Sequence, residues 1–84
     1  MSNAVLMTEV LNELIRATRI NKPFNSSHEG YAVILEEVDE LWAEVRKRRA
    51  ERDKGRMREE CIQIAAMAVR FINDICDSNQ REDI

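Results

Sequence analysis

The chain has 84 residues, of which 13 are basic and 16 acidic, so its formal net charge is −3, and 44% of its residues are apolar. Two glycines and one proline are too few for the many turns of an all-β fold, and 35% charged residues is typical of amphipathic helices. The composition therefore excludes a β-sandwich or barrel and predicts one small all-α domain over residues 1–84. Because so short a chain buries only about 60–65% of its unfolded surface, we expect a partner subunit to complete its core.

The first expected helix covers residues 4–20, where apolar residues recur with a helical period. Pro23 and the Asn and Ser residues that follow it end this helix, because proline disfavours helix at the preceding residue and the others favour turns. Ser26 followed by Glu29 is the pattern of a capping box, which predicts a second helix from there to about Arg52.

Gly55 is the expected break before a third helix over residues 56–77, and the polar tail over residues 78–84 is expected to fray. Ten of the twelve residues from Cys61 to Ile72 are apolar. Such a helix needs cover on more than one side, and we expect its back face to be exposed in a monomer; that face comprises Ile62, Ala66 and Val69. The prediction is a helical hairpin with a preceding helix, assembled into an oligomeric helix bundle as a homodimer or homotetramer. The alternative is an unusually apolar helix in a monomer.

No apolar run approaches the roughly 20 residues of a transmembrane helix, and the N-terminus has no signal-peptide pattern. We therefore expect a cytoplasmic protein that has no membrane partner. Eight of the 13 basic residues lie between Arg46 and Arg58 against two acidic ones, a local balance of +6, whereas the rest of the chain has a balance of −9. This distribution argues against nucleic-acid binding and fits either a small polyanion or a solvated helix end.

Acidic residues concentrate on the second and third helices. Helical projection places Glu37 at the edge of the second helix's apolar stripe with Glu40 beyond it, and Glu60 and Gln63 stand in nearly the same relation on the third helix. In an antiparallel hairpin these four side chains converge on one border of the core. Three carboxylates so placed repel one another by roughly 2–3 kcal/mol per pair. A divalent cation bound between them turns this repulsion into attraction. Oxygen ligands without His or Cys favour Mg²⁺, with Mn²⁺ as the alternative.

These residues resemble the signature of the MazG-like, all-α nucleoside triphosphate pyrophosphohydrolases, EExxE followed after a gap by ExxD. Glu36, Glu37 and Glu40 match the first half, and Glu60 matches the opening of the second half after 19 residues. Residues 23–31 and the chain onward to Asp74 are also similar to one branch of this family.

The resemblance implies Mg²⁺-dependent cleavage of an NTP or dNTP to the monophosphate and pyrophosphate. It assigns the metal ligands and a supporting carboxylate as follows: Glu37, Glu40, Glu60 and Gln63 as ligands, with Glu36 beside them. Gln63 stands where the family has Asp, and its amide offers an oxygen but no charge. The alternative function is therefore a catalytically weak or inactive nucleotide-binding or oligomeric module of the same fold.

Substrate-binding candidates are fewer. Arg70, on an otherwise apolar stretch, needs an anionic partner, which is either a substrate phosphate or Asp74 four residues on. Lys47 and Arg56 lie on the metal edge of their helices and are weaker phosphate candidates. His28 and Phe24 are candidates near the base or sugar, with a helix-start residue and a core aromatic as their alternatives.

Overall fold

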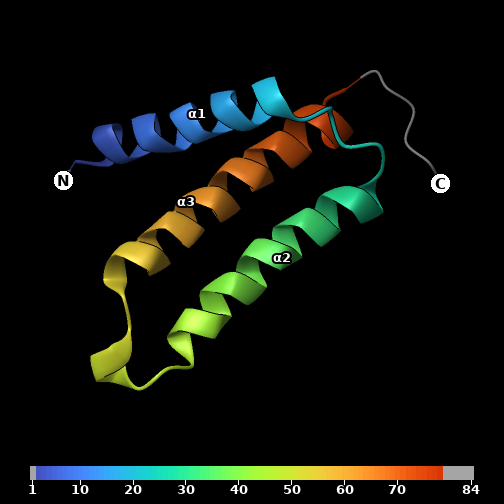
Figure 1. Ribbon diagram of the computed structural model, residues 1–84. Coiled ribbons are helices and arrows are strands. Elements are labelled where there is room, and N and C mark those ends of the chain that lie inside the picture. The colour runs from blue at the N-terminus through green and yellow to red at the C-terminus, as the bar shows by residue number, and fades with distance from the viewer. Residues whose placement is uncertain (1, 79–84) are drawn as a thin grey trace.

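The computed structural model describes residues 2–78 and contains three long helices, α1 (Asn3–Ile20), α2 (Ser27–Val45) and α3 (Lys54–Phe71) (Figure 1). A 3-10 turn, η1 (Arg49–Glu51), lies between α2 and α3, and a π-helical turn, η2 (Ile72–Cys76), continues α3. Every regular element within residues 2–78 is helical, which confirms the all-α prediction. None of these helices has the length and apolar composition needed to cross a bilayer.

Helix α3 lies between the other two, and α2 and α3 form an antiparallel hairpin (Figure 1). The predicted start of α2 is confirmed: the Ser26 hydroxyl accepts a hydrogen bond from the Glu29 N–H at 3.0 Å. The Glu29 carboxylate in turn accepts one from the Asn25 N–H at 2.9 Å. This reciprocal bonding satisfies N–H groups that a helix start would otherwise leave unpaired.

The predicted end of α2 near Arg52 is wrong, because the helix stops at Val45. Arg52 Nε donates to the carbonyl oxygens of Val45 and Lys47, at 2.8 and 3.1 Å, and so satisfies acceptors that a continuing helix would have used. The buried Glu44 carboxylate accepts from the Asp53 N–H at 2.7 Å and draws the chain back toward α2. Successive cations from Arg46 onward also repel one another at helical spacing.

The predicted break at Gly55 is also wrong, because α3 begins at Lys54 and Gly55 lies in its first turn. The start is set by Asp53, whose carboxylate accepts from the Arg56 N–H at 3.1 Å. At the other end, fraying is expected over residues 78–84, of which 79–84 lie outside the described part of the chain.

The core is small. Its buried hydrophobic residues within the described chain are Val10, Ala17, Phe24, Ala66 and Met67. The expectation that Ile62, Ala66 and Val69 form an exposed back face is wrong for two of them. Ala66 is fully buried in the cluster that contains Val10 and Ala17 of α1, and Ile62 is half-buried against it, because α1 covers this flank of α3; Val69 is exposed.

Candidate metal and substrate site

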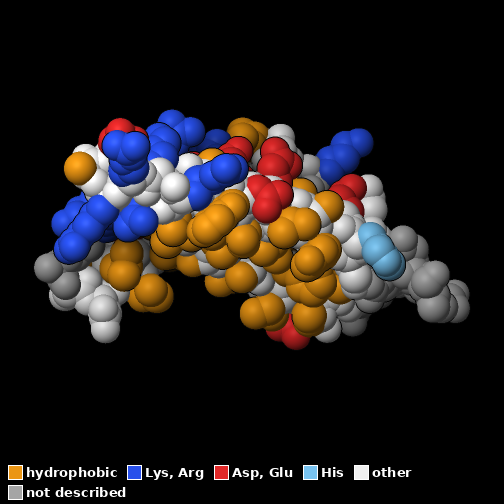
Figure 2. Space-filling model, turned by 90° about the horizontal axis from the view of Figure 1, so that it is seen from below, with side chains coloured by type: hydrophobic (Ala, Val, Ile, Leu, Met, Phe, Trp, Pro, Cys, Tyr) orange, Lys and Arg blue, Asp and Glu red, His pale blue; other side chains and the backbone are white. Residues whose placement is uncertain are grey.

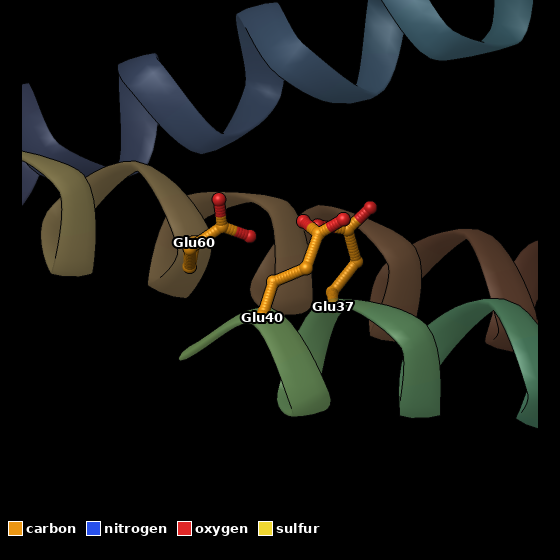
Figure 3. Close-up of side chains that lie close together, drawn as sticks. All are labelled: Glu37, Glu40 and Glu60. Atoms are coloured by element: carbon orange, nitrogen blue, oxygen red, sulfur yellow. The ribbon is translucent and has the colours of Figure 1, made fainter. Parts of the chain in front are cut away.

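Three carboxylates converge between α2 and α3. Glu37 and Glu40 lie one turn apart on α2, Glu60 lies on α3, and one oxygen from each falls within 4.8 Å of the others (Figure 3). The convergence predicted from helical projection is therefore confirmed for these three side chains. The hairpin creates it, because antiparallel helices bring residues from opposite ends of the intervening turn side by side.

Glu60 is the innermost member of this acidic cluster, with only 7% of its surface exposed. Its Oε1 lies 3.7 Å from the Arg56 Nε, whereas its Oε2 is buried and has no hydrogen-bond partner among the described residues. A buried carboxylate oxygen without a partner is costly, so the site is chemically suited to a group that supplies positive charge. The all-oxygen donor set and the orphaned Oε2 together fit a hard divalent cation.

The electrostatic repulsion among the carboxylates of the acidic cluster also favours a positively charged group in the site. Burial raises the pKa of Glu37 to about 7, assisted by the nearby carboxylates of Glu60 and Glu40. Burial, followed by the influence of the neighbouring Glu40 carboxylate, also raises the pKa of Glu60. Without a cation the acidic cluster therefore retains a proton near neutral pH, because its members cannot all ionise cheaply at this separation.

A cavity of about 520 Å³ opens beside the acidic cluster, with Glu37 and Gln63 in its wall. Its other walls come from the polar edge of α1, the loop that precedes α2, and the facing sides of α2 and α3. Apolar groups such as Val33 and Met67 alternate there with the amides of Asn21 and Asn25. The volume and mixed lining suit a small organic ligand with hydrogen-bonding groups.

Glu13 of α1 and Gln63 both line this cavity. Arg16 is the main cause of the lowered pKa of Glu13, and Gln63 adds a smaller contribution through a hydrogen bond. Arg16 binds the Glu13 carboxylate through two nitrogens, at 2.5 and 3.0 Å. The Gln63 amide is thus matched to a carboxylate on α1. An Asp at this position would place a second negative charge beside Glu13.

Arg70 and Asp74 fasten the loop that forms one cavity wall. Arg70 is buried, donates to the Lys22 carbonyl, stacks over the Phe24 ring at 4.2 Å and lies 3.4 Å from Asp74. Asp74 also accepts from the Phe24 N–H at 3.0 Å. Of the two partners considered for Arg70, the protein thus supplies Asp74, while the guanidinium still borders the cavity. Phe24 is a buried core aromatic, 2% exposed.

The remaining predicted site residues lie outside the three-carboxylate group. Glu36 is exposed and outside the three-carboxylate group. Lys47 lies just beyond the end of α2 and forms an ion pair with Glu44, with 2.9 Å between its Nζ and the Glu44 Oε2. Arg56 is the cation beside Glu60. His28 is exposed in the first turn of α2.

Sequence reasoning missed the α1 side of the cavity. Glu13 and Arg16 stand three residues apart, a spacing that favours an ion pair on a helix surface, but nothing in it shows that α3 lies opposite. Comparison of the chain with models of protein families, with curated proteins and with solved structures finds no match.

Proposed function

We propose that this protein is a Mg²⁺-dependent nucleoside triphosphate pyrophosphohydrolase of the MazG-like type, which cleaves an NTP or dNTP to the monophosphate and pyrophosphate. The observation that carries the proposal is the acidic cluster of Glu37, Glu40 and Glu60, in which Glu60 also has a buried, unpartnered Oε2. The match of Glu36, Glu37 and Glu40 to EExxE, and of Glu60 to the first position of ExxD, supports the same assignment.

Glu37, Glu40 and Glu60 would hold the cation, with the Gln63 amide as a further oxygen donor at the cavity side. Mg²⁺ is the favoured ion and Mn²⁺ the alternative, because the donors are hard oxygens and no His or Cys joins them. When bound, the cation would neutralise the negative charge that develops on the phosphate oxygens.

The position of the cavity supports a nucleoside as the rest of the substrate. It runs from Glu37 toward Glu29, eight residues along α2 or about 12 Å, which is long enough for a base and its sugar. The segment Arg46–Arg58 lies beyond the opposite end of the acidic cluster, and Lys and Arg side chains gather at that end of the molecule (Figure 2). A triphosphate laid along the hairpin would thus have its base in the cavity and its outer phosphates near Arg56.

The proposed reaction is hydrolysis between the α- and β-phosphoryl groups. Water attacks phosphorus, its proton passes to a carboxylate of the site, and pyrophosphate leaves with the electrons of the broken P–O bond. The chain's own contribution is to orient this water with one carboxylate, hold the nucleoside in the cavity and exclude bulk water from the buried Glu60 side.

The test is pyrophosphate release from a panel of standard and modified nucleotides in the presence of Mg²⁺. We expect turnover of at least one substrate, and a loss of about 100-fold or more in Glu60→Gln, because that variant keeps the shape of the site but removes a ligand charge. Glu59→Gln is the matched control, since Glu59 is exposed on the adjacent position. No pyrophosphate from any member of the panel would refute the enzyme.

The pairing of Gln63 with Glu13 favours a second candidate, a nucleotide-binding module of the same fold with little or no turnover. Thermal shift with Mg²⁺ and a nonhydrolysable nucleotide identifies it, because a specific ligand stabilises the folded state even when no product forms. Gln63→Asp should gain activity if the missing charge limits the metal site. The double variant Glu13→Gln with Gln63→Asp tests the same charge without the repulsion from Glu13.

A further inference from the structure

The cavity has an end remote from the acidic cluster, and the side chains there accept hydrogen bonds. Asn21 at the end of α1, Asn25 in the loop that precedes α2, and Glu29 in the first turn of α2 all line the cavity. Glu29 lies eight residues along α2 from Glu37, or about 12 Å away. We call Asn21, Asn25 and Glu29 the acceptor group. All three are exposed, so a ligand that enters the cavity can reach them.

The contacts of the two asparagines fix which way their amides point. The Asn21 Nδ2 donates to the Ala17 carbonyl oxygen at 3.2 Å, and the Asn25 Nδ2 donates to the Glu29 Oε2 at 3.4 Å. A carbonyl oxygen and an ionised carboxylate only accept, so the NH₂ of each amide has to face them. The Oδ1 of each asparagine has no partner among the described residues, and this oxygen also only accepts.

The donors around the cavity are mostly occupied by the protein itself. Arg16 uses its Nε and Nη2 on the Glu13 carboxylate. Arg70 donates to the Lys22 carbonyl and lies beside Asp74. The Lys22 ammonium remains, on a long exposed stem that has no ion-pair partner within residues 2–78. The fixed groups at this end of the cavity are therefore acceptors.

The acceptor group is also in place before a ligand arrives. The contacts from Arg70 and Asp74 fasten the loop that begins at Asn21 and carries Asn25. Glu29 in turn accepts from the Asn25 N–H at 2.9 Å. Groups that are positioned in advance lose little conformational entropy on binding, so their hydrogen-bonding pattern can discriminate between ligands.

A set of fixed acceptors selects a ligand that donates. The exocyclic amino group of cytosine or adenine donates hydrogen bonds, and carboxylate and amide oxygens are its usual protein partners. Uracil and hypoxanthine carry a keto oxygen at the corresponding position. That oxygen would meet acceptors and gain no hydrogen bond from them. The apolar side chains of Val33 and Met67, which also line the cavity, suit the faces of the ring.

We infer that the acceptor group selects nucleotides whose base carries such an exocyclic amino group, cytosine and adenine, over the deaminated bases uracil and hypoxanthine. The inference rests on the proposed placement of the nucleoside in the cavity and does not require turnover. It makes Asn21, Asn25 and Glu29 specificity-determining residues. A protein with this preference spares uracil and hypoxanthine nucleotides, so the removal of deaminated nucleotides is not its task.

Binding of nucleoside monophosphates in EDTA tests the preference without metal and without hydrolysis. The probes are two matched pairs, CMP with UMP and AMP with IMP. NMR titration, followed at the Asn25 and Glu29 N–H signals, should give dissociation constants about 10-fold lower for CMP and AMP, because each partner of the pair differs in one donor. Equal affinities within either pair, tighter binding of UMP or IMP, or no binding of any probe would overturn the inference. A failure of pyrophosphate release alone would refute the hydrolase and leave this result standing.

Two substitutions separate base selection from a structural role. Asn21→Ala removes one acceptor, while the backbone N–H of residue 21 keeps its 3.0 Å bond to the Ala17 carbonyl. The preference for CMP over UMP should then fall to about 3-fold, through weaker CMP binding. Glu29→Gln keeps an oxygen for the Asn25 N–H but adds an NH₂ that can donate to a keto oxygen, so UMP should bind more tightly. Asn12→Ala, exposed on α1 and outside this cavity, is the matched control. If Asn21→Ala and Glu29→Gln both keep the wild-type ratio, the inference is wrong.

Discussion

Because carboxylates are crowded between α2 and α3, ionisation of Glu37 should lower the stability of the metal-free protein as the pH rises. Glu37 has a pKa of about 7 against an ordinary value of 4.5. The folded state therefore binds a proton more tightly than the unfolded state, and stability falls as pH rises through this interval. Glu37→Gln removes the charge and preserves the shape, so it should stabilise the protein at pH 8 and have a smaller effect at pH 5.

The magnitude follows from the same values. The difference between 4.5 and about 7 corresponds to about 3 kcal/mol if solvent did not intervene. Glu37 is only partly buried, so screening reduces the expected gain to about 1–2 kcal/mol at pH 8.

Urea unfolding in the presence of EDTA, at one fixed protein concentration, measures this gain at both pH values. Glu36→Gln is the matched control, because Glu36 is the adjacent residue but is exposed and outside the acidic cluster. Its effect should stay within about 0.5 kcal/mol at either pH. A Glu37→Gln variant that is no more stable than wild type at pH 8 would show that the three carboxylates do not oppose folding, and the electrostatic basis for a cation there would be refuted.

Three further predictions follow from other contacts. Mg²⁺ affinity should rise about 10-fold between pH 6 and pH 8, because the ion must displace the proton whose pKa is near 7. Calorimetric titration measures this affinity, and an affinity that does not change with pH would contradict the presence of a proton in the acidic cluster. Gly30→Ala should destabilise the protein by about 1–3 kcal/mol, since a Cβ there would lie 2.6 Å from the Phe71 ring, while Gly55→Ala, in more open surroundings, should be neutral or slightly stabilising; equal effects in thermal unfolding would count against the packing of α2 on α3. Asp74→Ala should cost about 2–3 kcal/mol in denaturant unfolding, because it strips partners from Arg70 and the Phe24 N–H; a cost no greater than that of the exposed Asp77→Ala would show that the loop is held by other contacts.

The sequence was informative where local patterns decide the structure. Ser26 and Glu29 are neighbours in the chain, so their capping chemistry could be recognised directly. The convergence of Glu37, Glu40 and Glu60 followed from helical periodicity together with one assumption, that the second and third helices pack as a hairpin. Both features depend on short sequence separations or on a simple antiparallel arrangement.

The features that sequence reasoning missed depend on side chains that act at a distance. Helix α2 ends at Val45 because Arg52 and Asp53 return to bond its last turn, and that return is a property of the folded turn. The cavity joins residues of α1 to residues about 50 positions later on α3, and no periodicity reports which flank of α3 receives α1. The same uncertainty made Ala66 appear exposed when α1 in fact buries it.

The anchored loop between α1 and α2 opposes the exchange of α1 between two copies of the chain. Exchange of α1 between neighbouring molecules would require this connection to swing away from α3. Two contacts oppose that movement, the bond from Arg70 to the Lys22 carbonyl and the bond from the Phe24 N–H to Asp74. These contacts therefore hold α1 and its loop against the α3 of the same chain, so the cavity wall is built from residues of one chain.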